Sequence, residues 1–177
     1  MFKKYGFIGI LLIIFVEINF FLKVQPFANW YFPIIWFGYI LTIDALVYKL
    51  RGSSLISNKP RQFLGIAIIS MLLWWIFEFI NIPVQNWSYL GVEEISFKNL
   101  YGSISFATVL PAFFETVELI RSIHLFDKKE LKEKHKITKK FLHFMMFLGI
   151  ISFLLPIFLP KFAFPLVWLS FFLILDP

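Results

Sequence analysis

The chain has 177 residues, of which 59% are hydrophobic and 16% are charged, and its mean hydropathy is +0.79. Because so few polar side chains cannot cover a water-soluble core, the composition predicts a protein whose solvent is the lipid bilayer. The chain contains no cysteine, which excludes a disulfide framework, Cys-ligated zinc, iron–sulfur clusters and a thiol nucleophile.

The apolar residues gather in segments long enough to cross a membrane as helices. The first has a basic start, as a signal peptide does, but its apolar region is too long and no small-residue cleavage site follows it. We therefore predict an all-α fold, a polytopic transmembrane helix bundle that forms a single domain over residues 1–177. Its expected spans, about six, are 5–22, 32–48, 62–82, 101–122, 141–160 and 162–176.

The net charge of +6 indicates an orientation in the membrane. The basic residues lie mainly at Lys3 and Lys4 and in two short segments, 49–61 and 127–140. This pattern is typical of cytoplasmic loops and not of a nucleic-acid groove, so no nucleic-acid partner is expected. It predicts a multi-pass protein of the inner (cytoplasmic) membrane with a cytoplasmic N-terminus and a cytoplasmic loop at 123–140. Within that loop, Glu130 and Lys134 have the spacing of a short surface helix.

The second and sixth spans resemble each other. Phe, Pro, Trp, Leu and Asp recur in register in FPIIWFGYILTID (32–44) and FPLVWLSFFLILD (164–176), which predicts a partial parallel internal repeat. The last span is also short for a bilayer, at roughly 21 Å for about 14 residues. We expect either further spans in a longer natural protein or a homodimer to complete the repeat.

Polar and ionisable side chains inside predicted spans are costly in lipid and indicate functional sites. Glu78 and Glu115 are the candidate catalytic residues, since a carboxyl group held neutral in a low dielectric can donate or relay a proton. The candidate supporting residues within the membrane are Glu17, Asn19, Asp44, Asn81, Trp74 and Trp75.

Helical spacing places Trp74, Glu78, Asn81 and Gln85 on one face. We expect this face to turn to the bundle interior, with Glu17 or Asn19 of the first span as partners of Glu78. The two tryptophans either line a pocket or pack against neighbouring spans.

Three charged positions also have structural interpretations. Glu118 and Arg121 are expected to form an i, i+3 ion pair or to extend to the membrane surface. Asp44 has a functional interpretation and a structural one, in which it caps a helix end or pairs with Lys49 or Arg51.

Motifs for nucleotide binding, for a serine nucleophile and for zinc proteases are absent from the sequence. The three histidines have no metal-ligand spacing. We therefore expect no metal and no cofactor.

Four stretches, IDALVY, WWIFEFIN, QNWSYLGV and TVLPAFFETVEL, resemble an uncharacterised type of bacterial multi-span membrane protein over residues 30–120. The sequence also faintly resembles the membrane-embedded lycopene cyclases, which have a Trp-x-Tyr before a Gly and a proline followed by acidic residues and phenylalanines. The matching residues are Trp87, Tyr89, Gly91, Pro111, Phe113, Phe114 and Glu115. Two features depart from that family: PAFFE replaces paired acids directly after the proline, and Asp44 lies farther from Trp87 than the family's aspartate does.

Three classes of function fit these observations. The first is a membrane-embedded enzyme that acts on a lipid-soluble substrate, such as an isoprenoid or carotenoid, through Glu78 and Glu115. The second is a transporter or proton-coupled carrier, which the repeat favours. The third is a non-catalytic membrane subunit whose polar residues hold helices together.

Overall fold

The computed structural model describes residues 1–91, 95, 97–123 and 138–175. In lipid every backbone N–H and C=O needs an internal partner, and the described chain accordingly forms helices. They are α1 (Lys4–Phe21), α2 (Tyr31–Arg51), α3 (Leu55–Asn58), α4 (Pro60–Val84), α5 (Lys98–Phe106), α6 (Val109–Ser122), α7 (Lys139–Phe158), α8 (Pro160–Ala163) and α9 (Pro165–Leu175).

Five stretches of the described chain are long and apolar enough to cross a membrane, and they correspond to the first five predicted spans. They are Lys4–Phe21, Tyr31–Arg51, Pro60–Val84, Lys98–Ser122 and Lys139–Phe158. The multi-span, all-α prediction is thus confirmed by helix length and composition. The sixth predicted span is the 11-residue helix α9, which at 1.5 Å per residue is shorter than a hydrocarbon core of about 30 Å. The surface helix predicted around Glu130 lies outside the described residues.

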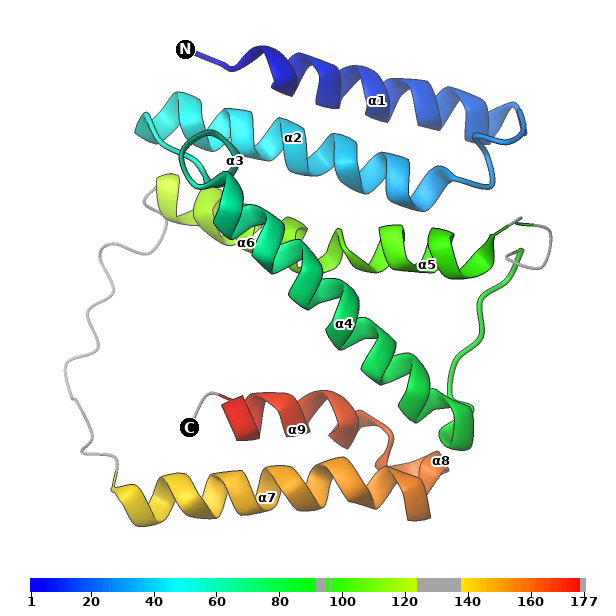
Figure 1. Ribbon diagram of the computed structural model, residues 1–177, viewed down its shortest axis with the longest axis vertical. Helices are drawn as coiled ribbons and strands as arrows, with labels where there is room; N and C mark the ends of the chain where they lie inside the picture. The colour runs from blue at the N-terminus through cyan, green and yellow to red at the C-terminus, as the bar shows by residue number, and fades with distance from the viewer. Residues whose placement is uncertain (92–94, 96, 124–137, 176–177) are drawn as a thin grey trace. The chain divides into compact units, whose positions relative to one another are not determined.

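The helices divide into two compact units, residues 1–75 with 90–129 and residues 76–89 with 130–177. In the first unit α1 and α2 lie side by side and run in opposite directions (Figure 1), and α2 also packs against α6. In the second unit α9 packs along α7. There Phe77 of α4 contacts Trp168 of α9, with ring centroids 4.5 Å apart.

Glycines set the contact between α1 and α2. A Cβ atom at Gly9 would lie 2.6 Å from the carbonyl oxygen of Gly38, and a Cβ at Gly38 would lie 2.8 Å from the carbonyl oxygen of Gly9. Small residues at such positions let helix backbones approach closely, which is the main source of helix association in a bilayer. The pair therefore fixes the position of α2, the helix that carries Asp44.

Gly38→Ala is expected to lower the stability of the protein by about 1–3 kcal/mol, because the added methyl group meets backbone that cannot move aside. The matched control is Gly65→Ala, since a Cβ at Gly65 of α4 meets no atom within 4 Å. Thermal unfolding in detergent, followed by circular dichroism, checks both variants. An unchanged melting temperature for Gly38→Ala would contradict this account of the contact.

The fourth predicted span, 101–122, is broken into two helices, α5 and α6. Pro111 has no N–H to donate to a carbonyl one turn earlier, so a continuous helix would lose a hydrogen bond there. The Ser70 hydroxyl of α4 enters the gap: it donates to the Phe106 carbonyl at 2.5 Å and accepts from the Leu110 N–H at 3.0 Å. A continuous helix would pair that carbonyl with that N–H, so Ser70 satisfies both at the break.

Candidate functional site

Asp44 lies near the end of α2 with its side chain fully buried, and three donors satisfy its carboxylate. Its Oδ2 accepts hydrogen bonds from the Tyr5 hydroxyl of α1 and, at 2.8 Å, from the Ser54 hydroxyl. Its Oδ1 accepts from the backbone N–H of Ile56 at 2.7 Å. Because Ile56 is the second residue of α3, the carboxylate caps that helix. The Ser57 hydroxyl lies 2.8 Å from the Tyr5 hydroxyl and extends the cluster.

The structural interpretation of Asp44 gives two alternatives, a helix cap or a pair with Lys49 or Arg51, and these hydrogen bonds match the first. Asp44 caps a helix, although it is the next helix and not its own. It does not pair with Arg51, whose guanidinium lies 2.5 Å from a Glu118 oxygen.

Glu115 contrasts with Asp44. It lies on α6, which packs against α2, and its side chain is also fully buried. No hydrogen-bond donor of the described residues reaches either carboxyl oxygen. The Asp44 carboxyl group is near enough to interact with it electrostatically and to accept a hydrogen bond from a protonated Glu115. An unpartnered ionised carboxylate would be very costly in such a place, so the neutral acid suits these surroundings.

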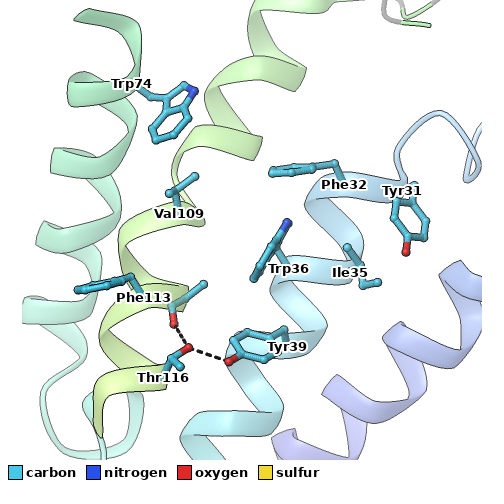
Figure 2. A pocket seen from close by; sticks show the side chains of 10 residues that line it. Tyr31, Phe32, Ile35, Trp36, Tyr39, Trp74, Val109, Phe113 and Thr116 are labelled. Atoms are coloured by element: carbon cyan, nitrogen blue, oxygen red, sulfur yellow. Dashed lines mark hydrogen bonds between the residues drawn. The ribbon is translucent and has the colours of Figure 1, made fainter. Parts of the chain in front are cut away.

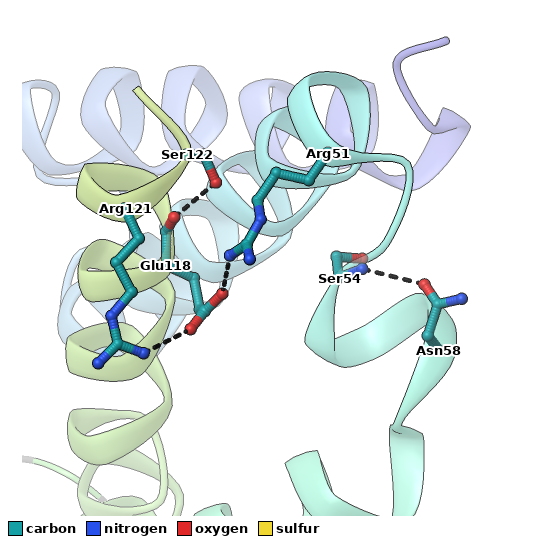
Figure 3. A network of polar contacts seen from close by, with 6 residues as sticks. All are labelled: Arg51, Ser54, Asn58, Glu118, Arg121 and Ser122. Atoms are coloured by element: carbon teal, nitrogen blue, oxygen red, sulfur yellow. Dashed lines mark hydrogen bonds and ion pairs between the residues drawn. The ribbon is translucent and has the colours of Figure 1, made fainter. Parts of the chain in front are cut away.

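Glu118, one turn beyond Glu115, forms the expected ion pair. Its carboxylate binds Arg51 at 2.5 Å and Arg121 at 3.1 Å, and its own side chain is 36% exposed (Figure 3). Exposed pairs of this kind contribute about 0.2–1 kcal/mol. The two arginines thus neutralise Glu118, and in the described chain neither of them bonds to the buried carboxyl group of Glu115.

An apolar pocket of about 720 Å³, the aromatic pocket, lies beside α6. Its walls come from α2, α4 and α6, and Figure 2 shows Phe32 and Trp36 reaching from α2 toward α6. The lining residues are Tyr31, Phe32, Ile35, Trp36, Tyr39, Trp74, Val109, Ala112, Phe113 and Thr116.

One hydroxyl pair interrupts the apolar lining of this pocket. The Tyr39 and Thr116 hydroxyls are 2.7 Å apart, and the Thr116 hydroxyl also donates to the Ala112 carbonyl at 2.7 Å (Figure 2). Glu115 directly precedes Thr116 in α6, so the pocket wall and the buried carboxyl group share one helical turn. The Glu115 side chain itself does not line the pocket.

Glu78 belongs to the second unit and is partly buried. Its Oε1 accepts a hydrogen bond from the Trp87 indole N–H at 3.0 Å and another from the Tyr89 hydroxyl at 2.5 Å. These donors come from the chain directly after α4, whereas the prediction placed its partners at Glu17 or Asn19. Glu78 and Glu115 fall in different units, so each has its own surroundings and the structure does not bring them together as one site.

Three other candidate supporting residues also form hydrogen bonds. The side-chain oxygen of Glu17 accepts from the Tyr31 hydroxyl at 2.9 Å, and the Asn19 amide donates to the Phe15 carbonyl of its own helix at 2.7 Å. The Trp75 indole donates to the Ser103 hydroxyl at 3.1 Å. Of the two adjacent tryptophans only Trp74 lines the aromatic pocket.

Sequence reasoning missed Tyr5, Tyr39 and the pocket face of α6. A signal was present in the spacing of α2, where Phe32, Trp36 and Tyr39 recur at i, i+4 and i+7 and so share one side of the helix. The bonds of Tyr5 could not be found this way, because they join α1 to residues 39 and 52 positions later.

Within the described residues, no three His, Cys, Asp or Glu side chains lie close enough together to hold a metal ion. No family model, curated protein or solved structure matches this chain. Helix length and composition therefore identify it only as a multi-span helical membrane protein.

Proposed function

We propose that the protein is a membrane-embedded enzyme that transfers protons to and from a lipid-soluble, isoprenoid-like substrate. The observation that carries the proposal is Glu115, a wholly buried carboxyl group that no hydrogen-bond donor of the described residues reaches. A stable bundle does not need such a group, because an apolar side chain of similar size would cost less free energy there. Ionisable side chains buried inside membrane-spanning helices commonly mark substrate or proton pathways.

The substrate class follows from the neighbouring pocket. Its volume falls within the range of small-molecule sites, about 300–1,000 Å³. Phe113, in its wall, is 62% exposed, so the pocket opens at an apolar surface that the bilayer would cover. The hydroxyl pair of Tyr39 and Thr116 suits a substrate with a long apolar body and one hydroxyl end.

The proposed chemistry needs no oxidant and no second substrate. Because Glu115 does not line the pocket, this step requires its side chain to turn toward the bound substrate. Its O–H then gives its proton to one carbon of a carbon–carbon double bond, which leaves a carbocation on the substrate. A neighbouring carbon then returns a proton to the Glu115 carboxylate, and the electron pair of its C–H bond forms a new double bond. The product has the same formula as the substrate with the double bond moved or a ring closed. The catalytic role predicted for Glu78 stays a prediction.

A second candidate function is a proton-coupled carrier. The observation that favours it is the proximity of two fully buried carboxyl groups, Asp44 and Glu115, since such pairs form proton relays in transporters. The inner-membrane location and the cytoplasmic N-terminus are likewise proposals, which the distribution of basic residues supports.

Farnesol that carries a photoreactive diazirine group tests the pocket. We expect it to label peptides containing Trp36 and Phe113, and unlabelled farnesol to compete while hexadecanol, which is as apolar as a lipid chain, does not. Trp36→Ala should raise the half-saturating concentration about tenfold, equivalent to about 1.4 kcal/mol. The control is Phe37→Ala on the same helix, because Phe37 is 40% exposed and lies outside the lining. Equal competition by hexadecanol would contradict an isoprenoid site.

A further inference from the structure

A second pocket lies at the C-terminal end of α4, in the second unit. It has a volume of about 600 Å³. Unlike the aromatic pocket it is polar, since six of its seven lining residues carry a side-chain hydrogen-bonding group and none is a lysine or an arginine. The lining residues are Glu78, Asn81, Ile82, Gln85, Asn86, Trp87 and Ser88.

The walls of this polar pocket are held by hydrogen bonds. The Asn81 Oδ1 accepts from the backbone N–H groups of Asn86 at 2.9 Å and Trp87 at 3.4 Å, and its Nδ2 donates to the Trp87 carbonyl at 2.9 Å. The Trp87 ring packs against Phe164, with centroids 5.5 Å apart. The segment that follows α4 is therefore fixed before any ligand arrives, which lowers the cost of binding.

Gln85 holds an unusual backbone conformation in the wall. Its φ is +50°, and its N–H donates to the Asn81 carbonyl at 2.7 Å, as in helix ends that normally use glycine. A non-glycine residue in this region is strained by about 1–2 kcal/mol. Such strain concentrates at binding and catalytic sites, and here it places an amide side chain in the lining.

The groups around the pocket favour a positive charge. Among the described residues, Trp87 and Tyr89 both donate to Oε1 of Glu78, so a ligand would bind at Oε2. The last carbonyls of a helix have no partner within it and carry a partial negative charge of about half an electron. The carbonyl oxygens at the end of α4 thus add to the negative potential, and the Gln85 amide supplies a further acceptor.

We propose that this polar pocket binds a primary ammonium group, with the Glu78 carboxylate as its counter-ion. An –NH₃⁺ group has three donors and no acceptor, which matches a carboxylate oxygen, an amide oxygen and helix-end carbonyls. In a membrane protein the ammonium group comes either from an ethanolamine lipid headgroup or from a soluble amine. This site is independent of the function proposed for Glu115.

Native mass spectrometry of the full chain, released from nanodiscs, tests the proposal. With phosphatidylethanolamine and phosphatidylglycerol of identical acyl chains at equal amounts, we expect at least tenfold more retained ethanolamine lipid. Glu78→Gln should abolish that preference. Glu17→Gln should keep it, because Glu17 is also a carboxylate that accepts from a tyrosine hydroxyl but lies outside the pocket.

A second variant separates loss of binding from loss of structure. Gln85→Gly removes the amide acceptor and suits the positive φ, so it should weaken ethanolamine-lipid retention without lowering the melting temperature. Free ethanolamine, titrated into the protein in phosphatidylglycerol nanodiscs, identifies the source of the ligand. Saturable binding that Glu78→Gln removes assigns a soluble amine, and absence of such binding together with lipid preference assigns the headgroup. Equal retention of the two lipids without ethanolamine binding, or a preference unaffected by Glu78→Gln, would overturn the proposal.

Discussion

Asp44→Ala is expected to destabilise the first unit by about 3–5 kcal/mol, as the loss of one partner from a buried charged cluster typically does. The substitution leaves the Tyr5 hydroxyl, the Ser54 hydroxyl and the Ile56 N–H without the acceptor that they share. Each buried donor without a partner costs about 1–3 kcal/mol. Thermal unfolding in detergent measures the loss.

Two further variants make the Asp44 result specific. Asp44→Asn keeps one side-chain oxygen as an acceptor but replaces the second oxygen with an NH₂ donor. The loss of stability should therefore fall between that of Asp44→Ala and zero. Glu17→Ala removes an exposed carboxylate with one tyrosine donor and should cost less than about 1 kcal/mol. A melting temperature for Asp44→Ala as high as that of Glu17→Ala would show that the buried cluster does not hold α1, α2 and α3 together.

The largest functional effect is expected from Glu115→Gln. Under the proposed chemistry, wild-type protein in D₂O should exchange deuterium into carbon positions of an unsaturated prenol such as farnesol, and mass spectrometry detects the added mass. Removal of the exchangeable proton should lower this rate by about 10²–10⁴-fold, the usual contribution of general acid–base catalysis. Farnesol labelling of the pocket should persist, since Glu115 does not line it.

Stability distinguishes a functional role of Glu115 from a structural one. Glu115→Met replaces this buried carboxyl group with an apolar side chain, so the melting temperature should stay the same or rise while exchange is lost. If proteoliposomes that contain the protein take up protons but the prenol gains no deuterium, the result would favour the proton-coupled carrier. Loss of folding in Glu115→Met, with normal exchange in Glu115→Gln, would leave only a structural role.

The long spans could be predicted from the sequence because each depends only on local composition. A run of about 20 apolar residues must form hydrogen bonds within itself in lipid, whatever its neighbours are. The break before Val109 could not be predicted in this way, since it depends on Ser70, a residue on another helix. The internal repeat stays a prediction; Asp176, its last matching residue, lies outside the described chain.

The helix faces of the candidate residues could be predicted from the sequence, but their hydrogen-bond partners could not. Helical spacing placed Glu78 and Asn81 on one face, and both line the polar pocket. The sequence could not reveal that the Asp44 carboxylate accepts three hydrogen bonds whereas no described donor reaches Glu115. Those donors come from residues distant in the chain or from backbone. Apolar periodicity describes which face a residue occupies, whereas partners depend on which helices meet.

The order in which the Asp44 cluster is completed has a consequence for biosynthesis. The three donors described above for Asp44, and the Ser57 hydroxyl that extends the cluster, lie within the first 57 residues, so the cluster can close before α4 leaves the ribosome. Domains fold from the N-terminus during synthesis, and an early hairpin of α1 and α2 would carry its carboxylate into the membrane already satisfied. Glu115 is made later and meets a cluster whose donors are all in use.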